Sequence, residues 1–333
     1  MEKNLQQTGE NMKRGLVVGK FYPFHQGHNY LINQAKKQVD RLTVLVCYRC
    51  TETIDVNLRA QWIQEEHPDI QVLIIFDIMD DENSKAWAEY TKKILGYVPD
   101  VVFSSEDYGE PYAYHLGCQH VLVDRERNTF PVCGTNVREK PLSNWEFLTP
   151  AVRGYYAKRV CVLGAESTGT TTMAQSLAEH YKTEWAFEFG RAYWEGKMAT
   201  KNSEWRTEDF IFIAQEQNRL EDYLAKYCNK ILLCDTNSLV TSLWHERYLG
   251  IISKEVEAVS ENYKYDFYFL TGNEIPFIQD GTRDGEHIRN RMHDRFKEEL
   301  TTKGIDFVEL TGSHNQRIKS AIKVCDQLLQ EEN

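Results

Sequence analysis

Long apolar segments are missing from this sequence. No run of apolar residues approaches the ~20 that a helix needs to span a bilayer, and the polar start MEKNLQQTGENMK lacks the apolar segment of a secretory signal. Of the 333 residues, 41% are hydrophobic and 27% are charged, as is typical of soluble globular proteins. We therefore expect a cytoplasmic protein that is not embedded in a membrane.

Positive charge is also scarce. The 39 lysines and arginines are outnumbered by 50 aspartates and glutamates, which gives a formal net charge of -11. Because duplex DNA attracts basic surfaces, this balance argues against a protein that wraps nucleic acid, and we expect no nucleic-acid partner. Local basic pockets for small phosphates remain compatible with it.

A second CxxC motif, which would favour a structural zinc site, is absent. Cys47 and Cys50 form one such motif, and His115, Cys118 and His120 are conceivable partners. Because these residues flank predicted strands, packing in the core or in a loop is preferred over metal binding. The 8 cysteines are scattered through a long chain, which suits reduced thiols better than a disulfide scaffold.

Short β-rich runs alternate with longer helical stretches in the first half of the chain. The runs are 15–19, 42–47, 71–77, 100–104 and 120–124, and the stretches with helical spacing are 29–39, 57–67 and 83–95. Brief apolar runs bounded by polar residues are typical of buried parallel strands. The alternation therefore predicts right-handed crossovers and a doubly wound α/β sheet.

The alternation breaks at LTPAVRGYYAKR, residues 148–159, and starts again with RVCVLG. Further strands are predicted at 231–235, 265–270 and 305–310, with long helical stretches such as 207–227 between them. The chain is also about twice the usual domain length of ~150 residues. We predict two doubly wound α/β domains, 15–150 and 158–333, after a short polar tail at 1–14.

The segment GKFYPFHQGH, residues 19–28, lies between the first predicted strand and a helix. A helix N-terminus at the carboxyl end of a strand attracts anions through its free N–H groups and its dipole. Gly19 and Gly27 let the backbone approach a ligand closely, and His25 and His28 are about one helical turn apart, so that both imidazoles can reach one phosphate. The segment predicts a binding site for the phosphates of a nucleotide.

The whole pattern G-x-F-x-P-x-H-x-G-H resembles the signature of the nucleotidyltransferase superfamily, which transfers a nucleotidyl group onto a phosphate-bearing acceptor. A second signature of that superfamily, [S/G]-T-x-x-R, is matched by Gly134, Thr135 and Arg138. The resemblance implies a Rossmann-like domain whose arginine holds the leaving pyrophosphate through its fork of N–H donors. It assigns catalysis to His25, His28 and Arg138, and ATP binding to Gly19, Lys20, Phe21, Gly27 and Thr135.

The second predicted domain opens with GAESTGTT, which has the spacing of the P-loop G-x-x-x-x-G-K-[ST] between a strand and a helix. Thr171 is placed to bind Mg2+ through its hydroxyl, but Thr170 stands where the motif has lysine. Either another cation supplies the missing charge or phosphoryl transfer is impaired. The predicted ATP site comprises Gly164, Ala165, Glu166, Ser167, Thr168, Gly169, Thr170 and Thr171.

Residues that would complete a kinase site occur at three further places. Asp235 ends a strand in the manner of a Walker B motif, where a carboxylate binds Mg2+ or serves as a base. Glu188 and Arg191 follow a short strand and would meet a ribose hydroxyl or act on its proton. The segment 280–295 looks like the lid of a small-molecule kinase, with a solvated helix face as the alternative, and carries Arg283, Arg289, Arg291 and Arg295.

These two domains in this order are similar to the NadR family, in which nicotinamide mononucleotide (NMN) adenylyltransferase is fused to ribosylnicotinamide kinase. The similar segments are GKFYPFHQGH, VLVDRERNTFPVCGTNVR and WEFL in the first half, and GAESTG, FEFGRAYWE, LLCDT and QDGTRDG in the second. The resemblance implies that NMN and ATP give NAD and pyrophosphate, and that ribosylnicotinamide and ATP give NMN and ADP. It further implies ATP and Mg2+ as cofactors, a homo-oligomer and a functional link to a ribosylnicotinamide transporter. Trp87 would stack on nicotinamide, with a core position as an equal alternative.

Two departures from the family leave alternatives open. Some relatives begin with a helix-turn-helix DNA-binding domain, but only about fourteen residues precede the first predicted strand, too few for that module, so we expect no repression through it. Thr170 leaves open a second domain that binds nucleotide as a sensor without kinase turnover. The first domain is also compatible with another acceptor, such as phosphopantetheine or a glycerol phosphate.

Overall fold

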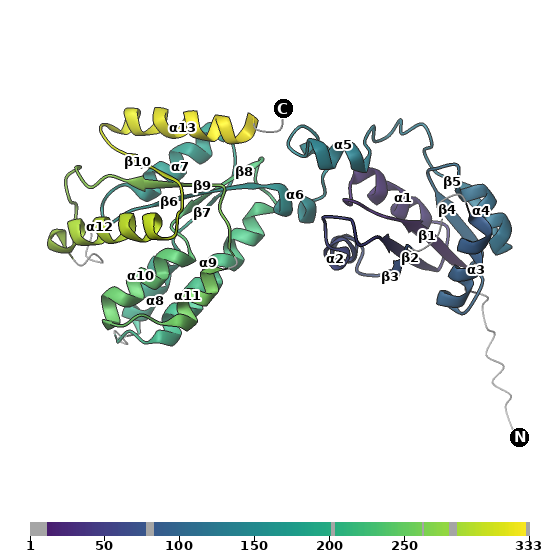
Figure 1. The fold of residues 1–333 in the computed structure, drawn as a ribbon, viewed down its shortest axis with the longest axis horizontal. Coiled ribbons are helices and arrows are strands. Elements are labelled where there is room, and N and C mark those ends of the chain that lie inside the picture. The colour runs from purple at the N-terminus through teal and green to yellow at the C-terminus, as the bar shows by residue number, and fades with distance from the viewer. Residues whose placement is uncertain (1–11, 78–82, 201–203, 262, 280–284, 331–333) are drawn as a thin grey trace, which may run out of the picture. The chain divides into compact units, whose positions relative to one another are not determined.

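The computed structural model describes residues 12–77, 83–200, 204–261, 263–279 and 285–330. The chain divides into two compact units, residues 1–152 and 153–333, and each is described by itself (Figure 1). Among the described residues, no helix is long and apolar enough to cross a membrane.

The first unit is built on a five-stranded parallel sheet with the strand order β3-β2-β1-β4-β5. Its strands are β1 (Arg14–Gly19), β2 (Arg41–Tyr48), β3 (Gln71–Phe76), β4 (Val101–Ser104) and β5 (Gln119–Leu122). Its helices are α1 (Gln26–Lys36), α2 (Val56–Glu66), α3 (Ser84–Leu95), α4 (Gly109–Leu116), α5 (Gly134–Glu139) and a 3-10 helix (Trp145–Phe147). Because the chain runs outward from β1 to β3 and then returns to the other side of β1, the strand order reverses between β1 and β4, where ligands bind in such sheets.

The second unit has a parallel sheet of its own, with the order β10-β9-β6-β8-β7. Its strands are β6 (Lys158–Leu163), β7 (Trp185–Ala186), β8 (Ile231–Asp235), β9 (Phe267–Thr271) and β10 (Phe307–Leu310). Helix α6 (Pro150–Tyr156) precedes it across the division. The other helices are α7 (Thr170–Tyr181), α8 (Phe189–Ala199), α9 (Thr207–Ala225), α10 (Ser238–Leu249), α11 (Lys254–Glu261), α12 (Glu286–Thr302) and α13 (His314–Gln330).

Strand β6 shows why helices cover both faces of the second sheet. Val160 and Val162 point to a core formed with α7 and α13, whereas Cys161 and Leu163 point to a core formed with α10 and α12. Side chains alternate between the faces of a strand, and here every one of these four is almost fully buried. An apolar run without polar alternation therefore requires a helix layer on each side (Figure 1).

The predicted fold class, two doubly wound parallel α/β sheets, is confirmed. Boundaries differ where apolar spacing carries no signal. Helix α1 begins at Gln26, three residues before the predicted stretch, because its first turn holds the polar residues of the histidine motif. Helix α4 was not predicted from the spacing at all.

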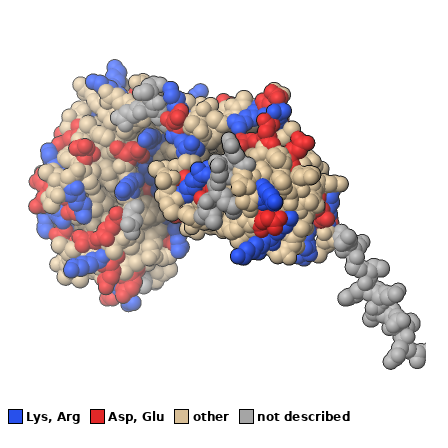
Figure 2. Space-filling view, turned by 45° about the vertical axis from the view of Figure 1, so that its right-hand side comes forward, with Lys and Arg blue, Asp and Glu red and all other residues tan. Residues whose placement is uncertain are grey.

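On the face in Figure 2, acidic and basic side chains are interspersed over both units.

Candidate active sites

In the first unit, His25 and His28 stack on each other at the start of α1. Their ring centroids are 3.7 Å apart, with 22° between the ring planes. A Cβ at Gly27 would lie 3.1 Å from Cε1 of His25, so the glycine leaves room for the stack. The Nδ1 atoms of both rings are buried and no described residue hydrogen bonds to them. Since buried polar atoms are normally hydrogen-bonded, both are candidates for contact with a ligand or an ordered water.

Burial decides the charge of the two imidazoles. It lowers the pKa of His25 to about 3, with the positive charge of Arg127 acting in the same direction. Burial also lowers the pKa of His28 well below its usual range, and His25 and Arg127 add to the effect. Both rings are therefore neutral at pH 7 in the ligand-free protein, and each offers one N–H donor and one acceptor.

The two nucleotidyltransferase signatures touch each other. Arg138, in α5, donates a hydrogen bond from Nη1 to the backbone oxygen of Tyr22 and one from Nη2 to Oγ1 of Thr135, 3.1 Å away. Its guanidinium also lies 4.2 Å from the centre of the Tyr22 ring. At Gly134 a Cβ would lie 2.6 Å from the same backbone oxygen, which explains why glycine stands there. The predicted residues of both signatures thus meet in one place.

A cavity of about 700 Å³ opens beside this contact. It is lined by predicted residues that include Gly19, Lys20, Phe21, His28, Trp87, Thr135 and Arg138. Trp87 both faces the cavity and packs on the core, its ring centroid 6.1 Å from that of Tyr90. The two alternatives for Trp87 therefore do not exclude each other.

Sequence reasoning missed a charged cluster in this cavity. The side chain of Asp77 is 1% exposed and pairs with Nε of Arg49 at 2.7 Å and with Nζ of Lys20 at 3.5 Å. Asp77 directly follows β3 and Arg49 directly follows β2. Polar residues at the carboxyl ends of neighbouring parallel strands were the available signal. The cluster places two cations in the cavity and fixes them with a buried carboxylate.

Of the residues considered for zinc, Cys47 lines this cavity, whereas His120 and Cys118 have other partners. Nε2 of His120 hydrogen bonds with Oγ of Ser104 at 2.8 Å, and the thiol of Cys118 donates to the backbone oxygen of Ala113. Across the described parts of the chain, no three histidine, cysteine, aspartate or glutamate side chains form a metal-binding group.

In the second unit, the P-loop between β6 and α7 is fixed by buried side chains. Gly169 has a φ of +89°, in the left-handed region that favours glycine. Oγ1 of Thr168 donates to the backbone oxygen of Ala165 at 2.6 Å. Arg317, which sequence reasoning missed, donates from Nη1 to the backbone oxygen of Thr168 at 2.9 Å and from Nη2 to that of Gly272 at 3.0 Å. These contacts preform the loop before any nucleotide binds.

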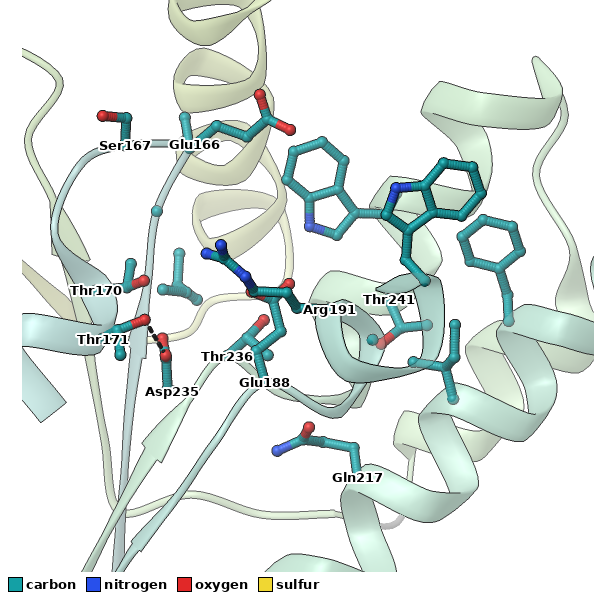
Figure 3. Close-up of a pocket in the computed structure, with 18 of the residues that line it drawn as sticks. Glu166, Ser167, Thr170, Thr171, Glu188, Arg191, Gln217, Asp235, Thr236 and Thr241 are labelled. Carbon is teal, nitrogen blue, oxygen red and sulfur yellow. Dashed lines mark hydrogen bonds between the residues drawn. The ribbon is translucent and has the colours of Figure 1, made fainter. Parts of the chain in front are cut away.

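Thr171 and Asp235 meet beneath the P-loop. The threonine hydroxyl donates to Oδ2 of Asp235 at 2.5 Å (Figure 3). Burial raises the pKa of Asp235 above its usual range, opposed by this hydrogen bond and by the charge of Arg191. Oδ1 of Asp235 is buried and accepts no hydrogen bond from a described residue. A hydroxyl and a carboxylate with a spare oxygen are donors that suit Mg2+.

A cavity of about 220 Å³ extends from the P-loop to α8 and α9. Glu188 and Arg191 line it, as do Gly164, Ala165, Glu166, Ser167, Gly169, Thr170 and Thr171. Figure 3 shows the Arg191 side chain extending across the cavity toward the P-loop. Nε of Arg191 also pairs with Glu195 at 3.2 Å, one turn further along α8.

Aromatic rings form the far wall of this cavity. Trp194, Trp205, Phe210, Trp244 and Tyr248 all line it. The rings of Trp194 and Trp205 are stacked, with centroids 4.7 Å apart and 18° between the planes. These residues lie on or beside three different helices, so no local pattern in the sequence indicated the wall.

The expected lid arginines take other positions. Arg283 lies outside the described residues. Arg289 is 3% exposed and donates from Nη2 to the backbone oxygen of Ser167 at 3.2 Å, so it supports the P-loop from behind. Arg291 is exposed, and neither Arg289 nor Arg291 lines the cavity. In this structure Arg289 is buried and Arg291 is exposed, and their expected contact with the substrate stays a prediction.

Known proteins match both units. The family described as "AAA domain" matches residues 159–317, and that described as "Citrate lyase ligase C-terminal domain" matches residues 14–87. Over 321 residues the chain is 30% identical to the trifunctional NAD biosynthesis/regulator protein NadR of Escherichia coli K12, a match that covers 89% of this chain and 78% of that protein. The chain belongs to the NadR family.

Further similarities cover one unit or the whole chain. A nicotinamide-nucleotide adenylyltransferase of Pyrobaculum arsenaticum is 27% identical over 188 residues, which cover 51% of this chain and 99% of that protein. A crystal structure of a NadR protein in complex with NR has a TM-score of 0.76 at 19% identity, and one in complex with NAD and AMP-PNP has 0.73 at 20%. Each covers 95% of this chain and 96% of the other. This chain thus has the same two α/β folds, in the same order, as those NadR structures.

Proposed function

We propose that this NadR-family protein makes NAD in two steps. The second unit phosphorylates ribosylnicotinamide to NMN, and the first unit adenylylates NMN to NAD. The observation that carries the proposal is the contact of Arg138 with the backbone of Tyr22. It joins the histidine signature to the arginine signature at the edge of a cavity that is also lined by Lys20, Arg49 and Arg127.

In the first unit, the residues position two phosphate-bearing substrates. A phosphate oxygen of NMN attacks the α-phosphorus of ATP, a new P–O bond forms, and the bond from the α-phosphorus to the bridging oxygen breaks to release pyrophosphate. His25 and His28 donate to the phosphates of ATP, and Arg138 holds the departing pyrophosphate. Lys20 and Arg49 bring positive charge to the NMN phosphate. Positioning and charge stabilisation suffice, because the substrate supplies its own nucleophile.

In the second unit, ribosylnicotinamide binds between the aromatic wall and the P-loop, a position supported by the residues that line the cavity. The cationic pyridinium ring stacks on Trp194 and Trp205, an arrangement favoured by the electron-rich faces of indoles. Glu188 accepts the proton of the ribose 5′-hydroxyl while its oxygen bonds to the γ-phosphorus of ATP. The bond from the γ-phosphorus to the β,γ-bridging oxygen breaks and ADP leaves.

The chemistry of this site also fits a magnesium ion. Thr171 and Asp235 would hold it, since one hydroxyl and the spare carboxylate oxygen of Asp235 are available there. When bound, Mg2+ would neutralise charge on the nucleotide phosphates. Cytoplasmic location, a homo-oligomeric assembly and the link to a ribosylnicotinamide transporter stay predictions.

The experiment is a turnover assay on the purified chain with Mg-ATP. One reaction contains NMN, a second contains ribosylnicotinamide, and a third series contains phosphopantetheine or glycerol phosphate with ATP or CTP. Chromatography follows NMN, NAD and the alternative products. We expect NAD from NMN, and NMN followed by NAD from ribosylnicotinamide.

Each outcome decides one half of the proposal. Faster turnover with phosphopantetheine or glycerol phosphate than with NMN would overturn the acceptor assignment of the first unit. NAD from NMN without any NMN from ribosylnicotinamide would leave the second unit a nucleotide-binding sensor.

A further inference from the structure

The phosphate site of the second unit has an excess of negative charge. Its cavity is lined by three carboxylates, Glu166, Glu188 and Asp235, and Thr170 occupies the position where a P-loop has its lysine. A nucleoside triphosphate carries several negative charges of its own. One Mg2+ would leave this site without a cation on the far side of the γ-phosphate, so the chain must supply one for fast phosphoryl transfer.

We propose that Arg191 is the catalytic residue that supplies the charge missing at Thr170. Among the described residues that line the cavity, Arg191 is the one arginine, lysine or histidine. Its side chain crosses the cavity toward the P-loop (Figure 3). The inference rests on the proposed kinase function and assigns a new role within it, because Arg191 acts on the phosphates of ATP and not on the ribose.

The sheet order explains how a residue of another element reaches this place. Strand β8 lies between β6 and β7 in the sheet. Strand β6 leads into the P-loop, β8 ends at Asp235, and β7 leads into α8. Ala186 of β7 is the register partner of Cys234, the residue before Asp235. Arg191, five residues after Ala186, therefore faces the P-loop across Asp235. Burial raises the pKa of Asp235, and the nearby charge of Arg191 opposes that rise, which agrees with this proximity.

The first turn of α8 is anchored, so that Arg191 is held in position. Oε1 of Gln217, in α9, accepts a hydrogen bond from the backbone N–H of Phe189 at 3.0 Å. Nε2 of Gln217 donates in turn to Oε1 of the buried Glu221 at 2.9 Å. The pair with Glu195 holds Nε of Arg191 from the solvent side. A planar guanidinium fixed at one end suits the binding of two phosphate oxygens at the other.

The described arginines of the expected lid do not serve this role. Arg289 is committed to the backbone oxygen of Ser167. Arg295 pairs with Glu246 at 3.0 Å and with Glu299 at 2.9 Å. Neither lines the cavity. Arg191 is therefore the residue to test.

The experiment compares Arg191→Ala, Arg191→Lys and the double variant Arg191→Ala/Thr170→Lys with the wild-type chain. NMN formation from ribosylnicotinamide and ATP is the main readout, and NAD formation from supplied NMN reports on the intact first unit. Arg219→Ala is the matched control, because Arg219 forms an ion pair within helix α9 with Glu216 and its side chain is 75% exposed. Circular dichroism checks that each variant is folded.

We expect Arg191→Ala to lower kcat for NMN formation at least about 100-fold, as for other arginines that act on a transferring phosphoryl group. Arg191→Lys should retain intermediate activity. Adding Thr170→Lys to Arg191→Ala should raise kcat for NMN formation at least about tenfold over that of Arg191→Ala alone. A purely structural role of Arg191 would not give this recovery. A kcat of Arg191→Ala within threefold of the wild type, or a double variant no better than the single one, would overturn the inference.

A binding measurement separates this inference from the proposed kinase function. Calorimetry with Mg-AMP-PNP, in the presence of saturating NAD to fill the first site, gives the affinity of the second site without turnover. If the wild-type chain makes no NMN, the kinase function fails, yet Arg191→Ala should still weaken AMP-PNP binding at least about tenfold. Equal AMP-PNP affinity of the two proteins would then refute the role of Arg191 on its own.

Discussion

The guanidinium of Arg138 rests on Tyr22, 116 residues earlier in the chain, with 4.2 Å between its central carbon and the ring centre. The arginine donates from Nη1 to the backbone oxygen of Tyr22 and from Nη2 to the hydroxyl of Thr135. Helix α5 and the histidine segment are thereby tied together at the carboxyl end of β1. The tie would set the position from which Arg138 makes its proposed contact with pyrophosphate.

We predict that Arg138→Ala lowers kcat for NAD formation from NMN on the order of 100-fold or more, as the loss of a preorganised donor at developing charge does. Arg138→Lys should lower kcat for NAD formation at least roughly tenfold. A charge-assisted hydrogen bond is worth about 1.5–3 kcal/mol, and lysine cannot form a bidentate contact. Steady-state kinetics with Mg-ATP and NMN measure both. Arg41→Ala, at an exposed position of β2, is the control, and equal rates for Arg138→Lys and the wild type would contradict the two-armed role.

The sequence predicted those parts of the fold and the sites that local patterns encode. Apolar runs located nine of the ten strands' positions closely enough to give two parallel sheets, and β7 was recognised as a short strand before Glu188. The signature spacings also predicted that Arg138 and His28 belong to one site, and both line the cavity of the first unit. Local patterns work here because each motif occupies one strand end and the helix that follows it.

Contacts between distant elements were beyond the sequence. Arg49 and Asp77 follow different strands, and their ion pair depends on the pairing of β2 with β3. Trp194 and Trp205 stack only because α8 and α9 pack together. The hydrogen bond from Arg289 to the backbone of Ser167 likewise depends on how α12 packs beside the P-loop. Tertiary packing decides which face of a helix lies against the neighbouring element, and a single sequence does not show that packing.

The buried histidines predict acid sensitivity of the first unit. The folded pKa of His25 is about 3 and that of His28 is also lowered, so as pH falls below 6.5 these two histidines take up protons in the unfolded chain before they do so in the folded one. Stability therefore falls as pH drops below 6.5, by about 2 kcal/mol at pH 5 for His25. His28 adds to the loss in the same direction. Urea unfolding at pH 7, 6 and 5 measures the loss.

The matched variants are His25→Gln/His28→Gln, which should flatten the pH dependence, and His180→Gln at an exposed site, which should leave it unchanged. The charge of Arg127 adds to the lowering of both pKa values. Burial lowers the pKa of His67 to about 4, so the double variant should keep a small pH dependence of its unfolding free energy. A double variant as acid-sensitive as the wild type would refute this account.

The contact of Thr171 with Asp235 predicts a metal-dependent defect in the second unit alone. Thr171→Ala and Asp235→Asn each remove an oxygen donor that suits Mg2+, and metal charge stabilisation is worth several kcal/mol. We expect kcat for NMN formation to fall at least 100-fold and the Mg2+ concentration for half-maximal rate to rise. Thr171→Ser keeps the hydroxyl and should stay within a few fold of the wild type. An unchanged Mg2+ requirement in Asp235→Asn would exclude this pair as metal ligands.

The aromatic wall predicts where ribosylnicotinamide affinity arises. Trp194→Ala should raise KM for ribosylnicotinamide roughly 2- to 10-fold with little change in KM for ATP, because an aromatic contact contributes about 0.5–1.5 kcal/mol. Trp194→Phe should lie between Trp194→Ala and the wild type. Tyr223→Ala, at a side chain 60% exposed on α9, is the control. A rise in KM for ATP instead would assign the wall to the nucleotide.

The fully buried Glu221 predicts the opposite pH response in the second unit. Burial raises its pKa to about 7, although hydrogen bonds from Tyr265 at 2.5 Å and Gln217 at 2.9 Å oppose the shift. Between pH 4.5 and 7, Glu221 is thus protonated to a greater extent in the folded chain than in the unfolded one. The stabilisation is complete below pH 4.5 and is lost as pH rises through 7. Arg159 stays positive throughout and pairs with Asp222 at 2.7 Å.

The difference in pH dependence between the wild-type chain and Glu221→Gln isolates this group from pH 6.5 to 8. Unfolded histidines, whose ordinary pKa is 6.5, are still partly protonated at pH 6.5 and affect both proteins equally, and burial holds the pKa of the neighbouring Cys234 well above its usual range. Across this window we expect the free energy of unfolding of the wild type to fall on the order of 1 kcal/mol relative to that of Glu221→Gln, which keeps the shape and a hydrogen-bonding group but cannot ionise. Urea titrations of both full chains measure the change. Equal pH dependence of the two proteins would mean that Glu221 is already ionised at pH 6.5, with Tyr265 and Gln217 outweighing its burial.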